Sequence, residues 1–367
     1  MTAATTAPGR AELLDRADRS GWAPIDLSLG NAGDRAPVEG SADLGGYPLC
    51  RGSEELRHAV AAMFRRDLDL LVDAGDVAAC AGVKEFIATT PLLLRGREPR
   101  DTVLVPQLAY PPYRHGVRLA GLVEHAVPTG PDGRMDLAAV PEEVAARALM
   151  LWVTSPGNPT GVVEDLRAVV AWGRARGVPV FVDEAYVDLV WSGEPGSVLR
   201  YGPDGVVAVQ SLSKSFGHPG ARLGWFAGDP GIVAQLVAAR RETGLIASAP
   251  SQAHAVAVLT AGAAARAQRR ELVGARLGDL VSALRDNGIG CPDPPGGMFA
   301  WVAAPDGDGD AFARRLATGA GIVAAPGSGF GDAGRGHVRL AAVAAPGRVA
   351  ARMARCQSLS DSVEVLR

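Results

Sequence analysis

The sequence has few lysines, cysteines, histidines and aromatic residues, and it has no long hydrophobic run. The four cysteines lie far apart, and neither they nor the six histidines show the spacing of a redox motif or a zinc site. No apolar stretch approaches the roughly 20 residues that a membrane-spanning helix needs. The polar first 21 residues lack the apolar segment of a secretory signal. We therefore expect a cytoplasmic protein with no membrane span and no dedicated metal site.

An excess of positive charge is also absent. The 37 Lys and Arg residues stand against 40 Asp and Glu residues, which gives a formal net charge of −3. This balance argues against a basic surface that binds nucleic acid. With 367 residues, the chain is long enough for one large domain or two moderate ones around a well-buried core.

Lysine is the scarcest charged residue. Only Lys84 and Lys214 occur, so nearly all basic residues are arginine. Arginine can replace lysine at most solvated surface positions, but not where a deprotonated, nucleophilic amine is needed. A lysine of this chain is therefore a better candidate for chemistry than a lysine usually is.

Between residues 77 and 209, short runs rich in strand-forming residues alternate with longer stretches of helical periodicity. A helix at 164–177 is predicted from apolar residues spaced three and four apart. Strand, helix and strand in this rhythm indicate a mostly parallel α/β sheet. The predicted strands are residues 101–105, 148–153, 178–182 and 205–209.

The remainder of the chain has the pattern of a long helix followed by a mixed α+β portion. The predicted elements are one helix at 229–265, a shorter helix at 310–319 and a strand at 336–341. We predict an N-terminal segment (1–40) packed with a smaller domain, a large α/β domain (41–243), and a linking helix with that smaller α+β domain (244–367).

A serine-lysine motif follows the predicted strand at 205–209. The motif is Ser211-Leu-Ser213-Lys214, and Arg222 stands eight residues after the lysine. In an open α/β sheet, binding sites form outside the carboxyl ends of the strands. Hydroxyl and guanidinium groups beside a reactive lysine suit a Schiff base next to a phosphate. A solvated loop lysine beside an ordinary turn is the alternative.

Two other strand ends carry candidate binding residues. Asp183 stands where the apolar run 178–182 ends, and Tyr186 follows three residues later. A carboxylate there suits a cation or a protonated ring nitrogen, but it also suits the cap of a following helix. After the strand at 148–153, the segment Ser-Pro-Gly-Asn158-Pro-Thr-Gly predicts a rigid turn that can fix the Asn158 amide.

Two glycine-containing segments suggest anion sites. Residues 81–85 begin an apolar helical stretch, and the first amides of such a helix suit a phosphate. The segment 327–331 superficially resembles a dinucleotide fingerprint. A polar glycine-rich turn and then a strand follow it, with no helix to receive a pyrophosphate. We therefore reject the second segment as a nucleotide site.

In order and spacing, these motifs resemble those of the fold type I, pyridoxal-phosphate-dependent aminotransferases of class I/II. The resemblance extends from about residue 30 to about residue 345, and the Lys214, Asn158 and Asp183 motifs carry it. It implies the α/β PLP-transferase fold, with a mostly parallel sheet in the large domain and a smaller α+β domain. It further implies pyridoxal 5'-phosphate as cofactor, and an amino acid and an oxo acid as substrates.

The resemblance also implies roles for the matched residues. Lys214 would form the Schiff base with the cofactor and move the proton at the substrate Cα, while Asp183 would keep the ring nitrogen protonated. Asn158 and Tyr186 would donate hydrogen bonds to the ring oxygen. The phosphate would be held by Ser211, Ser213 and Arg222 with the Gly82 and Val83 amides, and Lys84 would serve the same loop and helix start.

Weaker matches complete the resemblance. Tyr110, in Pro-Gln-Leu-Ala-Tyr-Pro, resembles the aromatic residue that stacks on the cofactor ring, and its alternative is a core tyrosine. Tyr47 resembles the tyrosine that reaches the phosphate of the neighbouring subunit, which implies a homodimer with shared sites. Arg339 resembles the arginine that pairs bidentately with the substrate carboxylate. Gly30 resembles the glycine that lines that pocket beside Asn158.

Within the family, residues 82–87 and 106–113 look most like actinobacterial succinyldiaminopimelate aminotransferases. We therefore expect glutamate as the amino donor, with N-succinyl-2-amino-6-oxopimelate as one candidate acceptor. The segment 216–220 after the lysine departs from the usual polar pattern, so the acceptor stays open. The same scaffold also supports elimination, decarboxylation and cyclisation, in primary or secondary metabolism.

A ligand-sensing regulator built on the same fold is an alternative from a different class. Such proteins carry an appended DNA-binding module, and only about 30 residues precede the first family match in this chain. We therefore expect an enzyme with no nucleic-acid partner.

Overall fold

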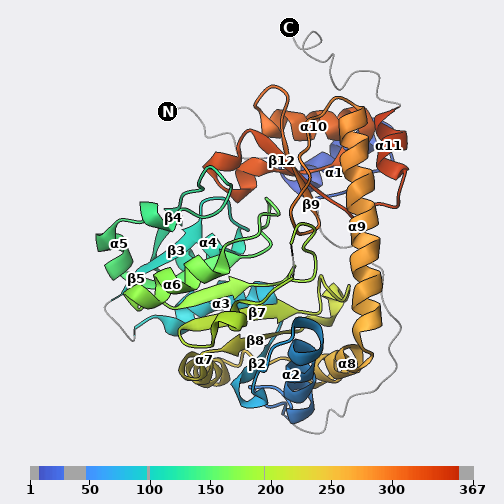
Figure 1. The fold of residues 1–367 in the computed structure, drawn as a ribbon. Helices are drawn as coiled ribbons and strands as arrows, with labels where there is room; N and C mark the ends of the chain where they lie inside the picture. The colour runs from blue at the N-terminus through green and yellow to red at the C-terminus, as the bar shows by residue number, and fades with distance from the viewer. Residues whose placement is uncertain (1–7, 29–46, 97–99, 194, 355–367) are drawn as a thin grey trace.

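The computed structural model describes residues 8–28, 47–96, 100–193 and 195–354. A seven-stranded sheet with the order β2-β8-β7-β6-β5-β3-β4 forms its centre (Figure 1). The strands from β3 to β7 are parallel, and β8 is antiparallel to both of its neighbours. The strands are β2 (Val77–Cys80), β3 (Thr102–Pro106), β4 (Val123–Val127), β5 (Ala148–Thr154), β6 (Val180–Asp183), β7 (Val206–Ser211) and β8 (Gly224–Gly228).

The four predicted strands correspond to β3, β5, β6 and β7, each to within two residues at either end. Their residues are almost all buried, as expected for a parallel sheet that helices cover on both faces. The predicted fold class is confirmed.

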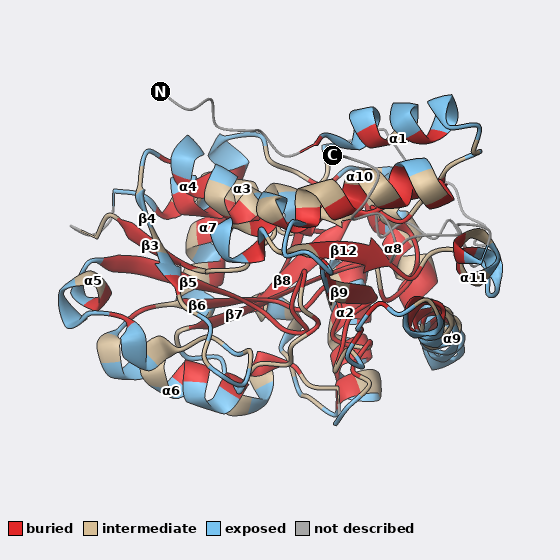
Figure 2. Ribbon diagram, turned by 90° about the horizontal axis from the view of Figure 1, so that it is seen from above, coloured by how far each residue is buried: buried red, intermediate tan, exposed pale blue. Residues whose placement is uncertain are grey.

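Helices cover both faces of this sheet (Figure 2). On one face, α3 (Val83–Leu94), α4 (Pro112–Leu119) and α7 (Pro230–Glu242) share an apolar cluster with the strands. On the other face lie α5 (Glu142–Ala146) and α6 (Leu166–Arg176), and α6 is the helix predicted at 164–177. Beside β2 and β8, α2 (Glu54–Leu68) packs against α8 (Ala249–Thr260).

A second, smaller body of structure comes mainly from the C-terminal third. β11 (Ala325–Pro326), β12 (His337–Ala341) and β9 (Phe299–Ala303) form an antiparallel sheet. The N-terminal helix α1 (Arg10–Arg19) buries Leu13 and Ala17 in the same apolar cluster as α10 (Gly309–Ala320), and β1 (Ile25–Asp26) pairs with β10 (Ile322–Val323). The helix and strand predicted at 310–319 and 336–341 are therefore α10 and β12. The division into domains stays a prediction.

The single helix predicted at 229–265 is wrong, because the structure has two separate helices, α7 and α8, and the start of a third in this range. α7 ends at Glu242, and Gly244 follows with a left-handed φ of +71°. α8 then begins after Ser248, whose side chain accepts a hydrogen bond from the Ser251 amide. Helical periodicity cannot detect such a break, because the apolar spacing continues through it.

The helix α9 (Ala263–Asp286) connects the two bodies (Figure 1). Its 24 residues give a length of about 36 Å. After it come β9, the small sheet and α11 (Arg348–Met353). Among the described residues, none of the helices combines the length and hydrophobicity that crossing a membrane requires. Single 3₁₀ turns occur at Ala74–Asp76, Leu137–Ala139, Val198–Tyr201, Pro219–Ala221, Gly327–Phe330 and Asp332–Gly334.

Candidate active site

The carboxyl ends of β5, β6 and β7 meet at one edge of the large sheet. Thr154 pairs with Asp183 across β5 and β6, and Ser211 ends the next strand. A cavity of about 480 Å³ opens at this edge. Its lining residues are Val83, Lys84, Tyr110, Asn158, Asp183, Ala185, Tyr186, Ser211, Ser213, Lys214, Pro219, Arg222, Phe299 and Arg339.

The structure thus brings together all but three of the predicted site residues. Gly82 lies directly behind the lining, against the Arg222 guanidinium. Tyr47 is fully exposed on the surface of the chain. Gly30 lies outside the described residues. One cavity therefore unites motifs that are spread over more than 250 positions of the sequence.

Asp183 is the last residue of β6 and is buried. Its Oδ1 accepts a hydrogen bond from the Ala185 amide at 2.9 Å, and its Oδ2 accepts one from the Tyr113 hydroxyl at 2.8 Å. Burial raises the pKa of Asp183 to about 6, and these hydrogen bonds and the Lys214 charge oppose the rise. The helix-cap alternative is wrong, because a turn follows Asp183 instead of a helix.

Lys214 follows the end of β7 and lines the same cavity. Burial lowers the pKa of Lys214 to about 8, and the positive charges of Arg339 and Arg269 lower it further, while Asp183 opposes them. About a tenth of such an amine is deprotonated at pH 7. The structure therefore gives this lysine, unlike a solvated loop lysine, the partly deprotonated amine that a nucleophile needs.

Gly82 and Arg222 are packed tightly against each other. Gly82 has a left-handed φ of +89°, and a Cβ on it would lie 2.6 Å from Arg222 Nη2. Only glycine therefore allows the guanidinium to approach so closely. Arg222 donates hydrogen bonds to the carbonyl oxygens of Pro219 and Ala81 at 3.1 and 3.2 Å.

We use the name anion cradle for the group formed by Gly82, Val83, Ser211, Ser213 and Arg222. Val83 is the first residue of α3, so the amides at this helix start have no acceptor within the helix. Ser211 and Ser213 lie at the neighbouring strand end and line the same cavity. Helix amides, hydroxyls and a guanidinium form a donor set that suits a phosphate.

Arg339, from β12, forms the opposite wall. Its Nη1 donates to Asn158 Oδ1 and its Nη2 to the Ser28 carbonyl, both at 2.6 Å. The guanidinium lies between the Phe299 and Phe330 rings, 4.2 and 4.8 Å from their centroids. Burial lowers the pKa of Arg339 to about 10, so it stays charged at neutral pH. Its buried Nε has no hydrogen-bond partner in the described part of the chain.

Tyr110 and Lys84 line the cavity beside α3 and α4. The Lys84 Nζ lies 5.9 Å from the centroid of the Tyr110 ring. Tyr110 is half-buried at the cavity, which does not fit the alternative of a core tyrosine. Tyr186 is buried, meets Phe299 edge-on at 5.5 Å, and has its pKa raised by that burial.

Sequence reasoning missed Tyr113, Phe299 and Phe330. Tyr113 stands three residues after Tyr110, and this helical spacing could have placed it next to the site. Phe299 belongs to an apolar strand, and no local pattern distinguishes it from its core neighbours. The segment 216–220, singled out as unusual, contains the buried His218, whose Nδ1 lies 3.1 Å from His254 Nε2 of α8.

Comparison with known proteins decides the family. The family model of aminotransferase class I and II matches residues 32–350. The chain belongs to this family. The aminotransferase is 36% identical to 4-dedimethylamino-4-oxo-anhydrotetracycline transaminase OxyQ of Streptomyces rimosus, covering 90% of this chain and 92% of that protein. It is 38% identical to a probable aminotransferase of Mycobacterium tuberculosis, covering 90% of this chain and 79% of that one.

A solved structure shares the fold of this aminotransferase. The probable N-succinyldiaminopimelate aminotransferase of Thermus thermophilus superposes with a TM-score of 0.84 at 29% identity. The superposition covers 95% of this chain and 98% of that one. The predicted family, fold and enzyme class are therefore confirmed.

Aminotransferases of this family use pyridoxal 5'-phosphate, and the cavity of this one fits that cofactor. Asp183 offers a buried carboxylate to a protonated ring nitrogen, and Lys214 offers an amine to an aldehyde. The anion cradle offers donors to a phosphate, at a place where a Cβ on Gly82 would displace Arg222. The predicted cofactor is confirmed, and the roles of the individual residues stay predictions.

Proposed function

We propose that this aminotransferase moves an amino group from glutamate to a 2-oxo acid or a related carbonyl compound. The observation that carries the proposal is the buried, charged Arg339, whose Nε has no partner among the described residues, in the cavity that Lys214 also lines. A substrate carboxylate would satisfy this donor. A carboxylate bound there fixes an α-amino acid relative to the lysine.

In this proposal, six residues of the cavity have distinct roles. Bound pyridoxal phosphate supplies the electron sink that weakens the Cα–H bond of the substrate. Lys214 would take the proton from the substrate Cα. Asp183 would hold the ring nitrogen in its protonated form, and Tyr110 would stack on the ring. Arg339 orients the Asn158 amide, which with Tyr186 would hydrogen-bond the ring oxygen.

Two relatives support two different acceptors. The likeness to the Thermus thermophilus protein, whose name specifies N-succinyldiaminopimelate, supports N-succinyl-2-amino-6-oxopimelate. The likeness to OxyQ, whose name specifies a 4-oxo-anhydrotetracycline, supports an oxo group on a polycyclic secondary metabolite. We propose the first as the leading acceptor and the second as the alternative.

The visible absorption spectrum of the holoenzyme tests this proposal, recorded before and after adding glutamate without an acceptor. We expect the bound cofactor to convert to a stable pyridoxamine form, and each candidate acceptor is then tested for restoring the original spectrum. A cofactor spectrum that glutamate leaves unchanged would contradict glutamate as donor and favour elimination, decarboxylation or cyclisation. Lys214→Ala is the control that should show no conversion.

We also propose that the active form is a cytoplasmic homodimer. Tyr47 is 100% exposed and Leu49 is 65% exposed, so the chain presents an aromatic and an aliphatic side chain outward next to each other. The resemblance assigns Tyr47 to the phosphate of the neighbouring subunit, and its full exposure is compatible with a task outside its own chain.

A further inference from the structure

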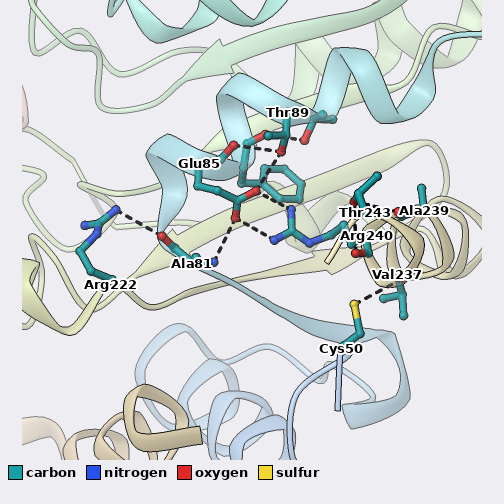
Figure 3. A network of polar contacts seen from close by, with 11 residues as sticks. Cys50, Ala81, Glu85, Thr89, Arg222, Val237, Ala239, Arg240 and Thr243 are labelled. Atoms are coloured by element: carbon teal, nitrogen blue, oxygen red, sulfur yellow. Dashed lines mark hydrogen bonds and ion pairs between the residues drawn. The ribbon is translucent and has the colours of Figure 1, made fainter. Parts of the chain in front are cut away.

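Glu85 and Arg240 form an ion pair behind the anion cradle, between α3 and α7 (Figure 3). Arg240 is completely buried, and its Nη1 and Nη2 donate to the two carboxylate oxygens of Glu85 at 2.9 and 2.7 Å. The guanidinium lies 5.9 and 6.0 Å from the centroids of the Phe86 and Phe226 rings. The pair is therefore bidentate and largely shielded from water.

The same carboxylate is tied to the cradle through one residue. Glu85 Oε2 accepts a hydrogen bond from the Ala81 amide at 3.0 Å, and Oε1 accepts one from the Thr89 hydroxyl at 2.9 Å. Arg222 donates to the Ala81 carbonyl on the other side (Figure 3). Ala81 is thus held at both its amide and its carbonyl, and the next residue is Gly82.

Without a partner, Glu85 would oppose the binding of an anion. It lies in the first turn of α3, where its carboxylate competes with a phosphate for the positive end of the helix and repels it. Bidentate pairing with Arg240 compensates the negative charge. The remaining hydrogen bonds direct both Glu85 oxygens toward Ala81 and Thr89.

We propose that the Glu85–Arg240 pair is a positioning device for the phosphate end of the cofactor. Arg240 neutralises Glu85, and Glu85 fixes Ala81 so that the Gly82 and Val83 amides and Arg222 face the phosphate. Neither member of the pair lines the cavity, so both act indirectly, through Ala81 and through the charge at the start of α3. This inference deepens the proposed function and rests on the assignment of the cradle to the cofactor phosphate.

Three variants of the full-length protein, each prepared without cofactor, separate charge from shape. Arg240→Met leaves the half-buried Glu85 with no compensating charge. Glu85→Gln keeps an acceptor for the Ala81 amide but removes the charge, and the third variant combines both changes. Arg241→Met, at the exposed neighbour on α7, is the matched control. Calorimetry measures the binding of inorganic phosphate, pyridoxal 5'-phosphate and phosphate-free pyridoxal.

For Arg240→Met we expect the dissociation constants of inorganic phosphate and pyridoxal phosphate to rise by about tenfold or more, since an uncompensated, half-buried negative charge remains at the start of α3. The constant for pyridoxal should stay within about twofold, because the disturbance acts at the phosphate end. Adding Glu85→Gln should recover most of the lost phosphate affinity. A merely structural role would weaken all three ligands together, and the double variant would recover nothing.

The inference is overturned if Arg240→Met binds both phosphate ligands like the wild type, or if pyridoxal loses affinity equally. If Arg240→Met does not fold, Arg240→Lys takes its place, because it keeps the charge but loses the bidentate geometry. This variant should show a smaller loss that is still confined to the phosphate ligands, and unchanged affinity would overturn the inference. A wild-type protein that binds no pyridoxal phosphate would overturn the proposed function as well, so the two failures are distinguishable.

Discussion

Burial moves the pKa values of Asp183 and Lys214 toward each other, to about 6 and about 8. As the pH rises from 6 to 8, the Asp183 carboxyl group becomes largely ionised, and a growing fraction of the Lys214 amine is deprotonated. A carboxylate and a neutral amine in one cavity are the protonation states that the proposed proton transfer needs. The two groups oppose each other's shift, because each stabilises the charged form of the other.

The first prediction concerns the reactivity of Lys214. Its acylation by acetic anhydride in the cofactor-free protein should rise with pH to a plateau, with a midpoint near pH 8 instead of the ordinary 10.5. Below pH 8 the labelling rate should fall about tenfold per pH unit, since only the neutral amine reacts. Mass spectrometry reads this directly, because Lys84 is the only other lysine and gives an internal reference. A midpoint above pH 10 would contradict the lowered pKa.

The second prediction concerns Tyr113, which donates to Asp183 Oδ2. Tyr113→Phe removes that donor, so the pKa of Asp183 should rise above 6 and less of the carboxylate should be ionised at a given pH. A hydrogen bond to a charged group contributes about 1.5–3 kcal/mol, which corresponds to an upward shift of about one to two pH units in the acid limb of kcat. Tyr201→Phe, in the 3₁₀ turn Val198–Tyr201, is the control. An unshifted acid limb would remove Tyr113 from this role.

At the scale of elements, Arg114 of α4 ties the small sheet to the large one. Its Nη1 donates to the Phe330 carbonyl at 2.8 Å, its Nη2 to the Gln107 carbonyl at 2.9 Å, and its Nε to Glu124 at 2.7 Å. The ring of Phe330 lies against the Arg339 guanidinium. Arg114 lies outside the cavity lining, and together with the Ala109 amide, which donates to the same Phe330 carbonyl at 2.9 Å, it holds the segment that packs on Arg339.

The third prediction follows from this contact. Arg114→Ala should raise the KM for glutamate about tenfold, the equivalent of one hydrogen bond near Arg339, because the Phe330 carbonyl loses one of its two donors and Phe330 is held less firmly. Cofactor affinity, measured separately by titration, should change far less, since the anion cradle lies elsewhere. Arg118→Ala, one turn later on α4 and exposed, should behave like the wild type. An unchanged KM for Arg114→Ala would show that Phe330 keeps its position without the hydrogen bond from Arg114.

The elements that the sequence predicts well are those whose signal is local. β5, β6 and β7 are apolar runs that end in Thr154, Asp183 and Ser211, so both the strands and their functional ends can be recognised. The break between α7 and α8 depends on Gly244. The apolar periodicity continues across this residue, so it does not reveal where α7 ends. The pairing of Glu85 with Arg240 joins positions 155 apart, and no local pattern encodes such a contact.

At the scale of the whole molecule, the exposed Tyr47 raises the question whether each active site is formed by one chain or by two. In the proposed homodimer, each site takes its Lys214 from one subunit and its Tyr47 from the other. In a mixed dimer of a Tyr47 variant with a Lys214 variant, both changes then fall in the same site, and the other site is intact. Mixing the two variants therefore gives an intact site if Tyr47 serves the neighbouring subunit, and none if Tyr47 serves its own chain.

The fourth prediction uses this difference. Tyr47→Ala should sediment as a dimer and bind pyridoxal phosphate about tenfold more weakly, as expected for the loss of a hydrogen bond to a charged group. Mixing it with Lys214→Ala, followed by unfolding and refolding together, should restore one high-affinity, active site per mixed dimer. If Tyr47 serves its own chain, no mixed dimer contains an intact site, and titration will detect no recovery.

The helix α9 gives the molecule a mechanical property. Near its beginning, Arg266 pairs with Asp67 and Asp188, and Arg269 donates to the Lys214 carbonyl at 3.4 Å, so this end is anchored beside the lysine. Its later turns bury Leu277 and Leu284 in the core of the small body. Over its length of about 36 Å, a tilt of only about 5° at the anchored end displaces the far end by about 3 Å. Because of this length, an angular change of α9 beside Lys214 would translate the body that carries Arg339.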